Sequence, residues 1–407
     1  MQATTHIVRR SACAAALAIL AIGVASVPAL AASTSPTILA PNDGVGGDLF
    51  GESTATSSNG DVTVVGAPEH NSSGAAYVFT RTGTTFSQTA ELTPSNPQAD
   101  EQFGQTVAIS GNGQTLVAAA PGAAGTSGSD QGAAYVFTDT GGTWTQIAEL
   151  TVPGTAELGS SLAISTDAST IVLGSETSNN DKGEAFVFTK SGSTYVRTQK
   201  LTEPASASLA LLGANTAISS NGSTIAFGEP QVGVTDVFTK AAGASTWTQT
   251  AQLHGGGDSV AVSGNGEIVA AGQAGINDLN GAVFVFTESG GTFTEASEVL
   301  PPENKTRASF AAGTNIGMSA SGSIIAFGAP TATAGSAFES GEVFVATETK
   351  TGTWKRTATD AEPNPVSDDD LGGGDQSVSV AGNGTAIVAG ARAANGQTGQ
   401  AIIFPVS

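Results

Sequence analysis

The chain has 407 residues, of which only 12% are charged and 53 are glycine. Its 14 Lys and Arg residues face 35 Asp and Glu residues, and the net charge of −21 excludes nucleic-acid binding by phosphate neutralisation and disfavours attachment to anionic membranes. Such an excess of acid either keeps the protein dissolved or indicates a cationic ligand or a basic partner. The single cysteine, Cys13, leaves no role for disulfides.

Residues 1–31 have the pattern of a secretory signal peptide. Arg9 and Arg10 supply the positive region, residues 12–27 the apolar region, and Ala29-Leu30-Ala31 the small-residue cleavage pattern. We expect cleavage near Ala31 and an exported protein, either secreted or periplasmic. The apolar run is short for a membrane span of about 20 residues, so no membrane insertion is expected.

From residue 43 onwards the chain repeats one unit seven times. Each unit has a turn glycine, a short apolar strand, an irregular loop, and a second glycine before an apolar-aromatic strand, as in 57–79 and 110–137. Units of roughly 50 residues with four short strands have the size of propeller blades. The second unit shows these strands at 106–110, 115–120, 133–138 and 143–150. The turn positions are Gly60, Gly113, Ala168, Gly222, Gly266, Gly322 and Gly384.

The fold class is therefore all-β, a seven-bladed β-propeller of four-stranded antiparallel blades that occupies residues 32–407 as a single domain. The seventh unit ends after its third strand, and residues 36–41 resemble the end of the first unit's fourth strand. We expect 36–41 to close the last blade, because closure removes exposed sheet edges. The expected blades are 43–96, 97–152, 153–204, 205–254, 255–301, 302–360, and 361–407 with 36–41.

An aromatic residue opens the fourth strand in six units. It recurs at the same hairpin, which favours packing between blades over a ring of sugar-stacking platforms. These residues are Phe86, Trp144, Tyr195, Trp247, Phe293 and Trp354.

Several short motifs resemble FG-GAP repeats, the blades of the integrin α-subunit head and of many bacterial exported proteins. They include Phe50-Gly51, Phe103-Gly104, Gly66-Ala67-Pro68 and Gly328-Ala329-Pro330. The resemblance implies a seven-bladed propeller. Many such blades carry an Asp-x-Asp-x-Asp-Gly calcium loop between strands 1 and 2. Here the equivalent turns, such as 58–61, lack the three alternating acids, so those sites do not carry over.

One acidic cluster remains a calcium candidate, in the loop that enters the last blade. It consists of Asp368, Asp369, Asp370 and Asp375, and the alternative is a solvated loop. No other cofactor is expected. The only histidines beyond the signal are His70 and His254, so a His/Cys metal site is not expected.

The connections between strands 2 and 3 and those between blades vary in length, and a propeller places both kinds on one face. We name this the long-loop face; it includes the loops 69–73, 122–131, 175–182, 273–280 and 331–340. A rigid scaffold with variable loops on one face favours recognition there. The candidate ligand-binding residues are Glu69, His70, Asp100, Glu101, Asp130, Glu176, Asp181, Asp278 and Glu339. Glu69 and His70 are expected to be exposed to solvent.

These observations predict an exported, non-enzymatic binding or adhesion module. Its expected partner is a protein or glycan at the cell surface or matrix, and the expected state is a monomer. Two alternatives stay open. One is an envelope hydrolase or lyase that uses paired carboxylates on the same scaffold, and the other is a structural matrix component.

Overall fold

The computed structural model describes residues 35–125, 130–202, 211–277, 280–302, 315–350 and 352–406. The chain falls into two compact units, residues 1–31 and residues 32–407, and the second is described below. The expected signal peptide and Asp278 lie outside the described residues. In the part of the chain described, no helix has the length and apolar character needed to cross a membrane.

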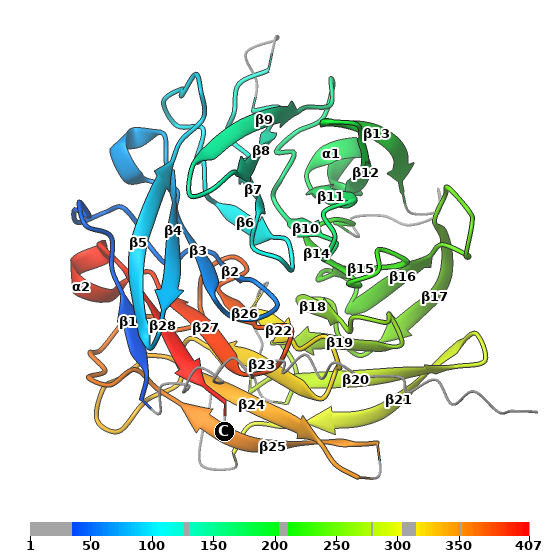
Figure 1. Cartoon of the computed structure of the whole chain (residues 1–407). Helices are drawn as coiled ribbons and strands as arrows, with labels where there is room; N and C mark the ends of the chain where they lie inside the picture. The colour runs from blue at the N-terminus through cyan, green and yellow to red at the C-terminus, as the bar shows by residue number, and fades with distance from the viewer. Residues whose placement is uncertain are drawn as a thin grey trace, which may run out of the picture. The chain divides into compact units, whose positions relative to one another are not determined.

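The described residues form seven separate four-stranded antiparallel sheets, which confirms the predicted propeller (Figure 1). In six blades the four strands follow one another in sequence, from β2-β3-β4-β5 in blade 1 to β22-β23-β24-β25 in blade 6. The inner strand of each blade contacts the inner strand of the next, and β26 of blade 7 contacts β2 of blade 1. The ring of blades is therefore closed.

The strands fall into four sets according to their position in the blade. The inner strands are β2 (Thr54–Thr56), β6 (Thr106–Ile109), β10 (Leu162–Ile164), β14 (Asn215–Ile218), β18 (Ser259–Val262), β22 (Ile316–Met318) and β26 (Val378–Val380). The second strands are β3 (Val62–Ala67), β7 (Thr115–Ala120), β11 (Thr170–Ser175), β15 (Thr224–Glu229), β19 (Ile268–Gln273), β23 (Ile324–Ala329) and β27 (Ala386–Ala391).

The third strands are β4 (Ala75–Thr82), β8 (Ala133–Asp139), β12 (Glu184–Ser191), β16 (Val234–Thr239), β20 (Ala282–Ser289), β24 (Glu342–Glu348) and β28 (Gln400–Pro405). The outer strands are β5 (Thr85–Leu92), β9 (Trp144–Leu150), β13 (Thr194–Leu201), β17 (Thr248–His254), β21 (Thr292–Val299), β25 (Trp354–Asp360) and β1 (Thr37–Leu39). Three short helical turns, η1 (His70–Ser72), α1 (Ser178–Asp181) and α2 (Ala394–Gln397), lie in loops between second and third strands.

The burial of the strands follows from their composition. The second strands are mostly apolar, and β7 is buried along its whole length, because neighbouring blades cover both of its faces. The outer strand β5 alternates between exposed and partly buried residues, as expected of a strand with one solvated face. The core is therefore divided among the junctions between blades.

The prediction that the N-terminal strand closes the last blade is confirmed. β1 pairs antiparallel with β28, with Thr37 opposite Ile403 and Leu39 opposite Ala401. Leu39 is only 2% exposed and packs in the cluster that joins blades 7 and 1. Figure 1 shows the two ends of the described chain side by side in this blade.

The turns between strands 1 and 2 share one design. In blade 1, Ser57 Oγ accepts from Val62 N–H and donates to Asn59 Oδ1, and Gly60 follows with φ 72°. All seven predicted turn positions have positive φ, including Ala168 at 57°. The turn is thus satisfied by its own side chains, and a loop of this type has few oxygens left for a cation.

These seven turns are joined to one another by backbone hydrogen bonds that form a closed ring, which we call the hairpin belt. Each blade's turn donates one N–H to a carbonyl in the turn of the following blade, and the last blade's turn donates to the first. Donor first, the bonds are Ser58 to Gly111, Gly111 to Thr166, Thr166 to Ser220, Asn221 to Gly264, Gly264 to Ala320, Ala320 to Gly382, and Asn383 to Ser58.

The Phe-Gly and Gly-Ala-Pro motifs meet where one blade packs against the next. A Cβ added to Gly66 of blade 1 would lie 1.9 Å from the carbonyl oxygen of Gly104 in blade 2. Glycine is required at this position because the backbones approach too closely for a side chain.

The aromatic residues that open the outer strands pack between blades, as predicted. Trp354 joins the cluster that contains Val283 and Val285 of blade 5. It also donates from Nε1 to the carbonyl of Gly322 in its own 1–2 turn, at 2.9 Å. Tyr195 and Trp247 make the same bond to Ala168 and Gly222.

Candidate functional site

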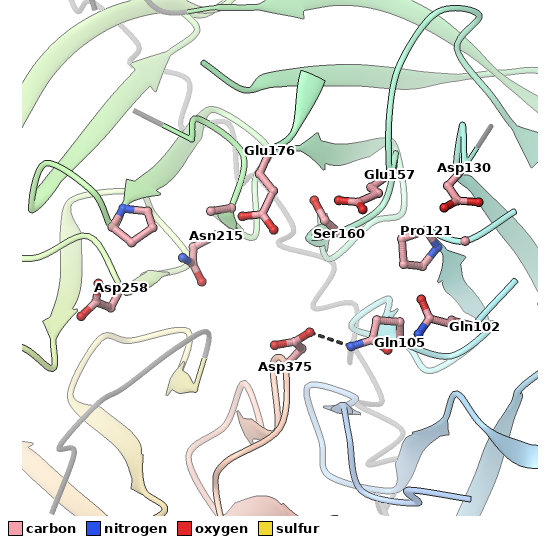
Figure 2. A pocket seen from close by; sticks show the side chains of 13 residues that line it. Gln102, Gln105, Pro121, Asp130, Glu157, Ser160, Glu176, Asn215, Asp258 and Asp375 are labelled. Atoms are coloured by element: carbon pink, nitrogen blue, oxygen red, sulfur yellow. Dashed lines mark hydrogen bonds between the residues drawn. The ribbon is translucent and has the colours of Figure 1, made fainter. Parts of the chain in front are cut away.

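A cavity of about 420 Å³ opens at the centre of the ring on the long-loop face (Figure 2). Its lining comes from the loops that enter blades 2, 3, 4, 5 and 7 and from the 2–3 loops of blades 2, 3 and 4. We call this cavity the acidic mouth. It is lined by Gln102, Gln105, Pro121, Gly122, Asp130, Glu157, Ser160, Glu176, Ala214, Asn215, Pro230, Asp258 and Asp375.

Five of these residues are carboxylates, and none is Lys or Arg. Figure 2 shows Glu176 and Asp375 reaching toward the centre of the mouth from facing sides. Burial raises the pKa of Glu176, and the negative charges of Asp375 and Glu157 raise it further. Burial also raises the pKa of Asp258, although a hydrogen bond from Ala274 N–H opposes that shift. The acids therefore repel one another in a partly desolvated space.

One wall of the mouth is braced across non-adjacent blades. Gln105 Nε2 of blade 2 donates to Asp375 Oδ2 of blade 7 at 2.6 Å and to Glu52 Oε1 of blade 1 at 3.3 Å. Arg392 Nη1 lies 3.0 Å from both carboxylate oxygens of Glu52, and Arg392 Nε donates to Asp370 Oδ2 at 2.8 Å. The Arg392 guanidinium is thus held beside the mouth by Glu52 and Asp370, two acids that do not line the mouth.

The central channel continues below the mouth as a second cavity of about 220 Å³, lined mainly by inner-strand residues such as Val260, Ile316 and Val380. Gln376 Nε2 of blade 7 donates across the channel to the carbonyl of Leu162 in blade 3, at 3.0 Å. This side chain lies between the mouth and the channel.

Two polar atoms of lining residues lack a protein partner. Within the described ranges, Ser160 Oγ and Asn215 Oδ1 are buried and make no hydrogen bond to another protein group. A buried polar atom left unpaired costs about 1–3 kcal/mol. Both residues line the mouth, although these two atoms themselves are enclosed.

Three of the sequence-predicted residues line the mouth, namely Asp130, Glu176 and Asp375. Glu69 lies near its rim, where Oε1 accepts from Gln102 Nε2 at 3.5 Å. The remaining candidates of the long-loop face do not line it. Asp100 and Asp181 are exposed and Glu339 is partly exposed, all with positive φ, and Asp278 lies outside the described residues.

Two predicted acids are buried and hold their own loops. Glu101 is fully buried, and its Oε1 accepts from Gln98 N–H at 3.0 Å. Asp369 is 5% exposed, and its Oδ2 accepts from Val366 N–H at 2.7 Å. Each carboxylate satisfies the backbone donor three residues earlier, and each is thereby engaged in loop structure.

The four acids of the calcium candidate have separate surroundings. Asp368 is exposed, Asp369 holds its loop, Asp370 pairs with Arg392, and Asp375 points into the mouth. Among the described residues, the three-ligand cluster that meets metal-site geometry is a different one, Asp43, His70 and Glu91.

His70 differs from its expected exposure. Only 3% of it is accessible, and its Nδ1 lies 3.0 Å from Asp48 Oδ2. The ring packs edge-on against Tyr77, with centroids 5.7 Å apart. The sequence indicated a loop position, and burial in that loop depends on side chains that come from elsewhere in the blade.

Sequence reasoning missed Glu157, Asp258, Gln105, Glu52 and Arg392. A signal for part of this set was present in the third residue of the Gly-Ala-Pro motif. Where blades 1, 2, 4 and 6 have proline and blade 5 has Ala274, blade 3 has Glu176 and blade 7 has Arg392. These two substitutions within the repeat place charged side chains at or beside the acidic mouth.

Solved structures of diverse origin resemble the chain in fold. A chain of the mitotic checkpoint complex matches with a TM-score of 0.58 at 13% identity, and the match covers 92% of this chain and 96% of that one. The Myceliophteria thermophila Cps50 (Swd1) β-propeller domain matches with a TM-score of 0.58 at 9% identity, over 92% and 100% of the two chains. These identities show the fold alone.

A third match is a putative 6-phosphogluconolactonase from Bacteroides uniformis, with a TM-score of 0.56 at 14% identity over 82% and 90% of the two chains. No curated protein matches this sequence. The fold and its central site define the class of the protein, a seven-bladed β-propeller with an acidic mouth.

The family is recognised from the repeats. The FG-GAP repeat matches residues 34–79 and 86–137, which cover the closing strand and most of blades 1 and 2. Blades 1 and 2 are therefore similar to FG-GAP repeats, and the other five blades share the fold of the matched ones. FG-GAP repeats are typical of extracellular proteins, and propellers of this kind serve as protein-binding or structural modules.

Proposed function

We propose that the protein is an exported, non-enzymatic binding module that receives a basic segment of a protein partner in the acidic mouth. The observation that carries this proposal is the set of five carboxylates around one cavity whose lining contains no Lys or Arg. A volume of about 420 Å³ falls in the range of ligand pockets, roughly 300–1,000 Å³.

A cationic side chain suits the mouth for an electrostatic reason. Burial and mutual repulsion raise the pKa of Glu176, so a positive charge between Glu176, Glu157 and Asp375 relieves an unfavourable arrangement. The net charge of −21 also steers basic partners toward the protein.

Export is part of the proposal and is supported by the N-terminal pattern around Arg9, Arg10 and Ala31. The family's extracellular occurrence agrees with it. A partner at the cell surface or in the matrix follows from this location. A neutral glycan is the competing ligand class.

The test is binding of labelled peptides that carry one central Lys or Arg in a neutral sequence, measured by fluorescence anisotropy at physiological salt. Peptides with Gln at the centre report uncharged recognition, and neutral oligosaccharides serve as competitors. We expect E176Q and D258N to weaken binding at least fivefold. E295Q is the matched control, because Glu295 is exposed on the outer strand β21.

Equal weakening by E295Q would mean that binding reflects net charge and would contradict a site in the mouth. Failure of every basic peptide to bind would also refute the proposal. If neutral oligosaccharides displaced the bound peptide and salt did not, the natural ligand of the mouth would be a glycan.

A second candidate function is cleavage of an acidic or neutral polysaccharide. The observation that favours it is the raised pKa of Glu176 beside the carboxylates of Asp375 and Glu157, the pattern of a general acid paired with a base. Release of reducing ends from envelope or matrix polysaccharide that is lost in E176Q would establish it. Absence of release by the wild-type protein would exclude this candidate for the substrates tested.

A further inference from the structure

A cluster of one imidazole and two carboxylates lies in blade 1, outside the acidic mouth. His70 Nε2 is 3.7 Å from Asp43 Oδ2 and 3.6 Å from Glu91 Oε1, and the three ligand atoms lie within 4.8 Å of one another. The residues come from three segments: the linker after β1, the turn η1 and the outer strand β5.

The distances match the needs of a tetrahedral metal ion. Ligand atoms about 2.0–2.1 Å from Zn²⁺ at tetrahedral angles are separated by about 3.3 Å. The two measured separations from Nε2 exceed this value by only a few tenths of an ångström, which small side-chain rotations remove. Asp43 and Glu91 are partly exposed, so an ion reaches the site from solvent.

Two of the three side chains are oriented by partners behind them. Asp48, itself buried, accepts a hydrogen bond from His70 Nδ1 at 3.0 Å, and this fixes the tautomer that directs the Nε2 lone pair toward the cluster. Tyr77 donates from its hydroxyl to Asp43 Oδ1 at 3.1 Å, which leaves Oδ2 for the ion. A carboxylate behind a ligating histidine is a common feature of zinc sites.

The neighbouring Asn71 is consistent with this tautomer. Asn71 Nδ2 lies 2.7 Å from His70 Nε2, so the amide donates to the lone pair that a metal ion would take. Rotation of the amide frees Nε2 and brings Oδ1 to the same side, where it or a water completes the coordination.

From this geometry we propose that Asp43, His70 and Glu91 bind Zn²⁺, with Asp48 as a positioning residue. An imidazole nitrogen favours zinc over calcium, which prefers oxygen ligands only. The proposal is independent of the acidic mouth. A bound Zn²⁺ ties the linker that follows the closing strand to the 2–3 loop and to the outer edge of blade 1.

The rival occupant of the cluster is a proton. A protonated His70 would pair with Asp43 and Glu91 without any metal, and the contacts would then serve folding alone. The number of metal ions bound per chain and the visible spectrum of bound Co²⁺ distinguish a metal site from a protonated His70. An ion pair without metal binds no ion and gives no such spectrum.

The experiment is equilibrium dialysis of the purified protein, without a polyhistidine tag, against Zn²⁺ at pH 7.5, with metal counted by mass spectrometry. Co²⁺ is the spectroscopic probe, since tetrahedral sites give intense visible bands. We expect one Zn²⁺ per chain, loss of binding in H70A and E91Q, and about 10–100-fold weaker binding in D48N.

The matched controls are E149Q and H254A, which should bind zinc as the wild type does. Glu149 stands in blade 2 where Glu91 stands in blade 1, and His254 is exposed at the end of β17. H70A should fold, because alanine fills the corresponding buried position in blade 2, at Ala123. Absence of bound zinc in the wild type, or equal binding in H70A and E91Q, would overturn the proposal.

Discussion

Blades 1 and 2 have the same four-strand order, yet among their described residues the cluster of three candidate ligands occurs in blade 1 alone. In both, a tyrosine of the third strand faces a glutamate of the outer strand, Tyr77 with Glu91 and Tyr135 with Glu149. In both, an acid holds the entering loop, Asp48 through Val45 N–H and Glu101 through Gln98 N–H.

Two of the three candidate ligands differ between the blades, and the loop acid is Asp48 in one and Glu101 in the other. Where blade 1 has Asp43 and His70, blade 2 has Asn96 and Ala123. Blade 2 keeps a cavity of about 240 Å³ at this place, lined by Asn96, Glu101, Ala123, Tyr135 and Glu149 among others. Both blades thus have the second strand, the loop acid and the tyrosine as part of the repeat. The metal-binding arrangement of blade 1 requires Asp43 and His70 in addition.

The segments that enter the two blades should differ most in their effect on stability. Residues 36–41 precede blade 1 and close the ring as a free strand, whereas the corresponding segment before blade 2 is part of the continuous strand β5. Deletion of 36–41 should lower the free energy of unfolding by about 4 kcal/mol or more, because buried Leu39 alone is worth about 2–5 kcal/mol. Urea denaturation measures the change.

A matched pair of point variants tests the same contact. L39A should be strongly destabilising, whereas I38A should have little effect because Ile38 is 46% exposed. Equal effects of the two substitutions, or an unchanged midpoint after deletion, would contradict closure by this strand.

The next largest effect concerns transfer of the cluster to blade 2. The double substitution Asn96→Asp with Ala123→His should raise the zinc stoichiometry from one to two, since the cavity has room for the imidazole. At a zinc concentration 100 times the Kd, each site should add about 2.7 kcal/mol to the free energy of unfolding. Thermal unfolding with zinc and with chelator measures this gain.

The single substitution N96D is the control for the graft, because it adds an acid without the imidazole. A second zinc in N96D alone would show that carboxylates suffice. No second zinc in the double variant would show that blade 1 depends on features beyond the five aligned residues.

The contact between the two blades gives a third prediction. Gly66 stands in β3 where blade 2 has Ala119, and a methyl group on Gly66 would meet the Gly104 carbonyl at 1.9 Å and Ser53 Oγ at 2.4 Å. G66A should therefore destabilise the protein by about 1–3 kcal/mol. G83A is the control, since nothing lies near a Cβ there and its positive φ carries only a backbone cost. If G66A were no worse than G83A, the close approach would not matter.

The smallest expected effect concerns blade 7, where Asp369 is a third copy of the loop acid. Burial raises the pKa of its neighbour Glu362 to about 8, and the hydrogen bond and charge of Asp369 contribute. The folded protein then keeps a proton that the unfolded chain releases near pH 4.5. The associated stability is present below about pH 4.5 and is lost as the pH rises to about 8.

E362Q should remove this pH dependence, because a neutral amide can donate to Asp369 and accept from Gln400, as the protonated acid does. We expect the variant to gain at least about 1 kcal/mol over the wild type at pH 8 and nothing at pH 4.5. Unfolding free energies across this range test it, with E348Q as an exposed control. An unchanged pH slope in E362Q would show that Glu362 is ionised in the folded state.

The repeat made the fold predictable, whereas the site depends on contacts that no local pattern encodes. Strand 2 of blade 2 was expected at 115–120 and is Thr115–Ala120, because turn residues and apolar runs fix a hairpin locally. Asp375 and Gln105 meet across the mouth although 270 residues separate them in sequence. Likewise His70 is recognisable as unusual only once Asp43, Asp48 and Glu91 converge on it from three segments.

The hairpin belt affects which positions of the ring could serve as the ends of the chain. Every blade contributes one bond to the belt, and the bond from Asn383 to Ser58 spans the junction of blades 7 and 1. As in blade 4, the donor in blade 7 lies one residue later in the turn than in the other five blades. That junction therefore has a belt bond like the other six, and no blade is terminal in the circle. Since Thr37 and Ile403 are paired neighbours, a short linker from residue 406 to residue 35 would join the ends without strain. The architecture thus permits circular permutation, with new ends opened at an outer hairpin such as 140–143 and the belt left whole.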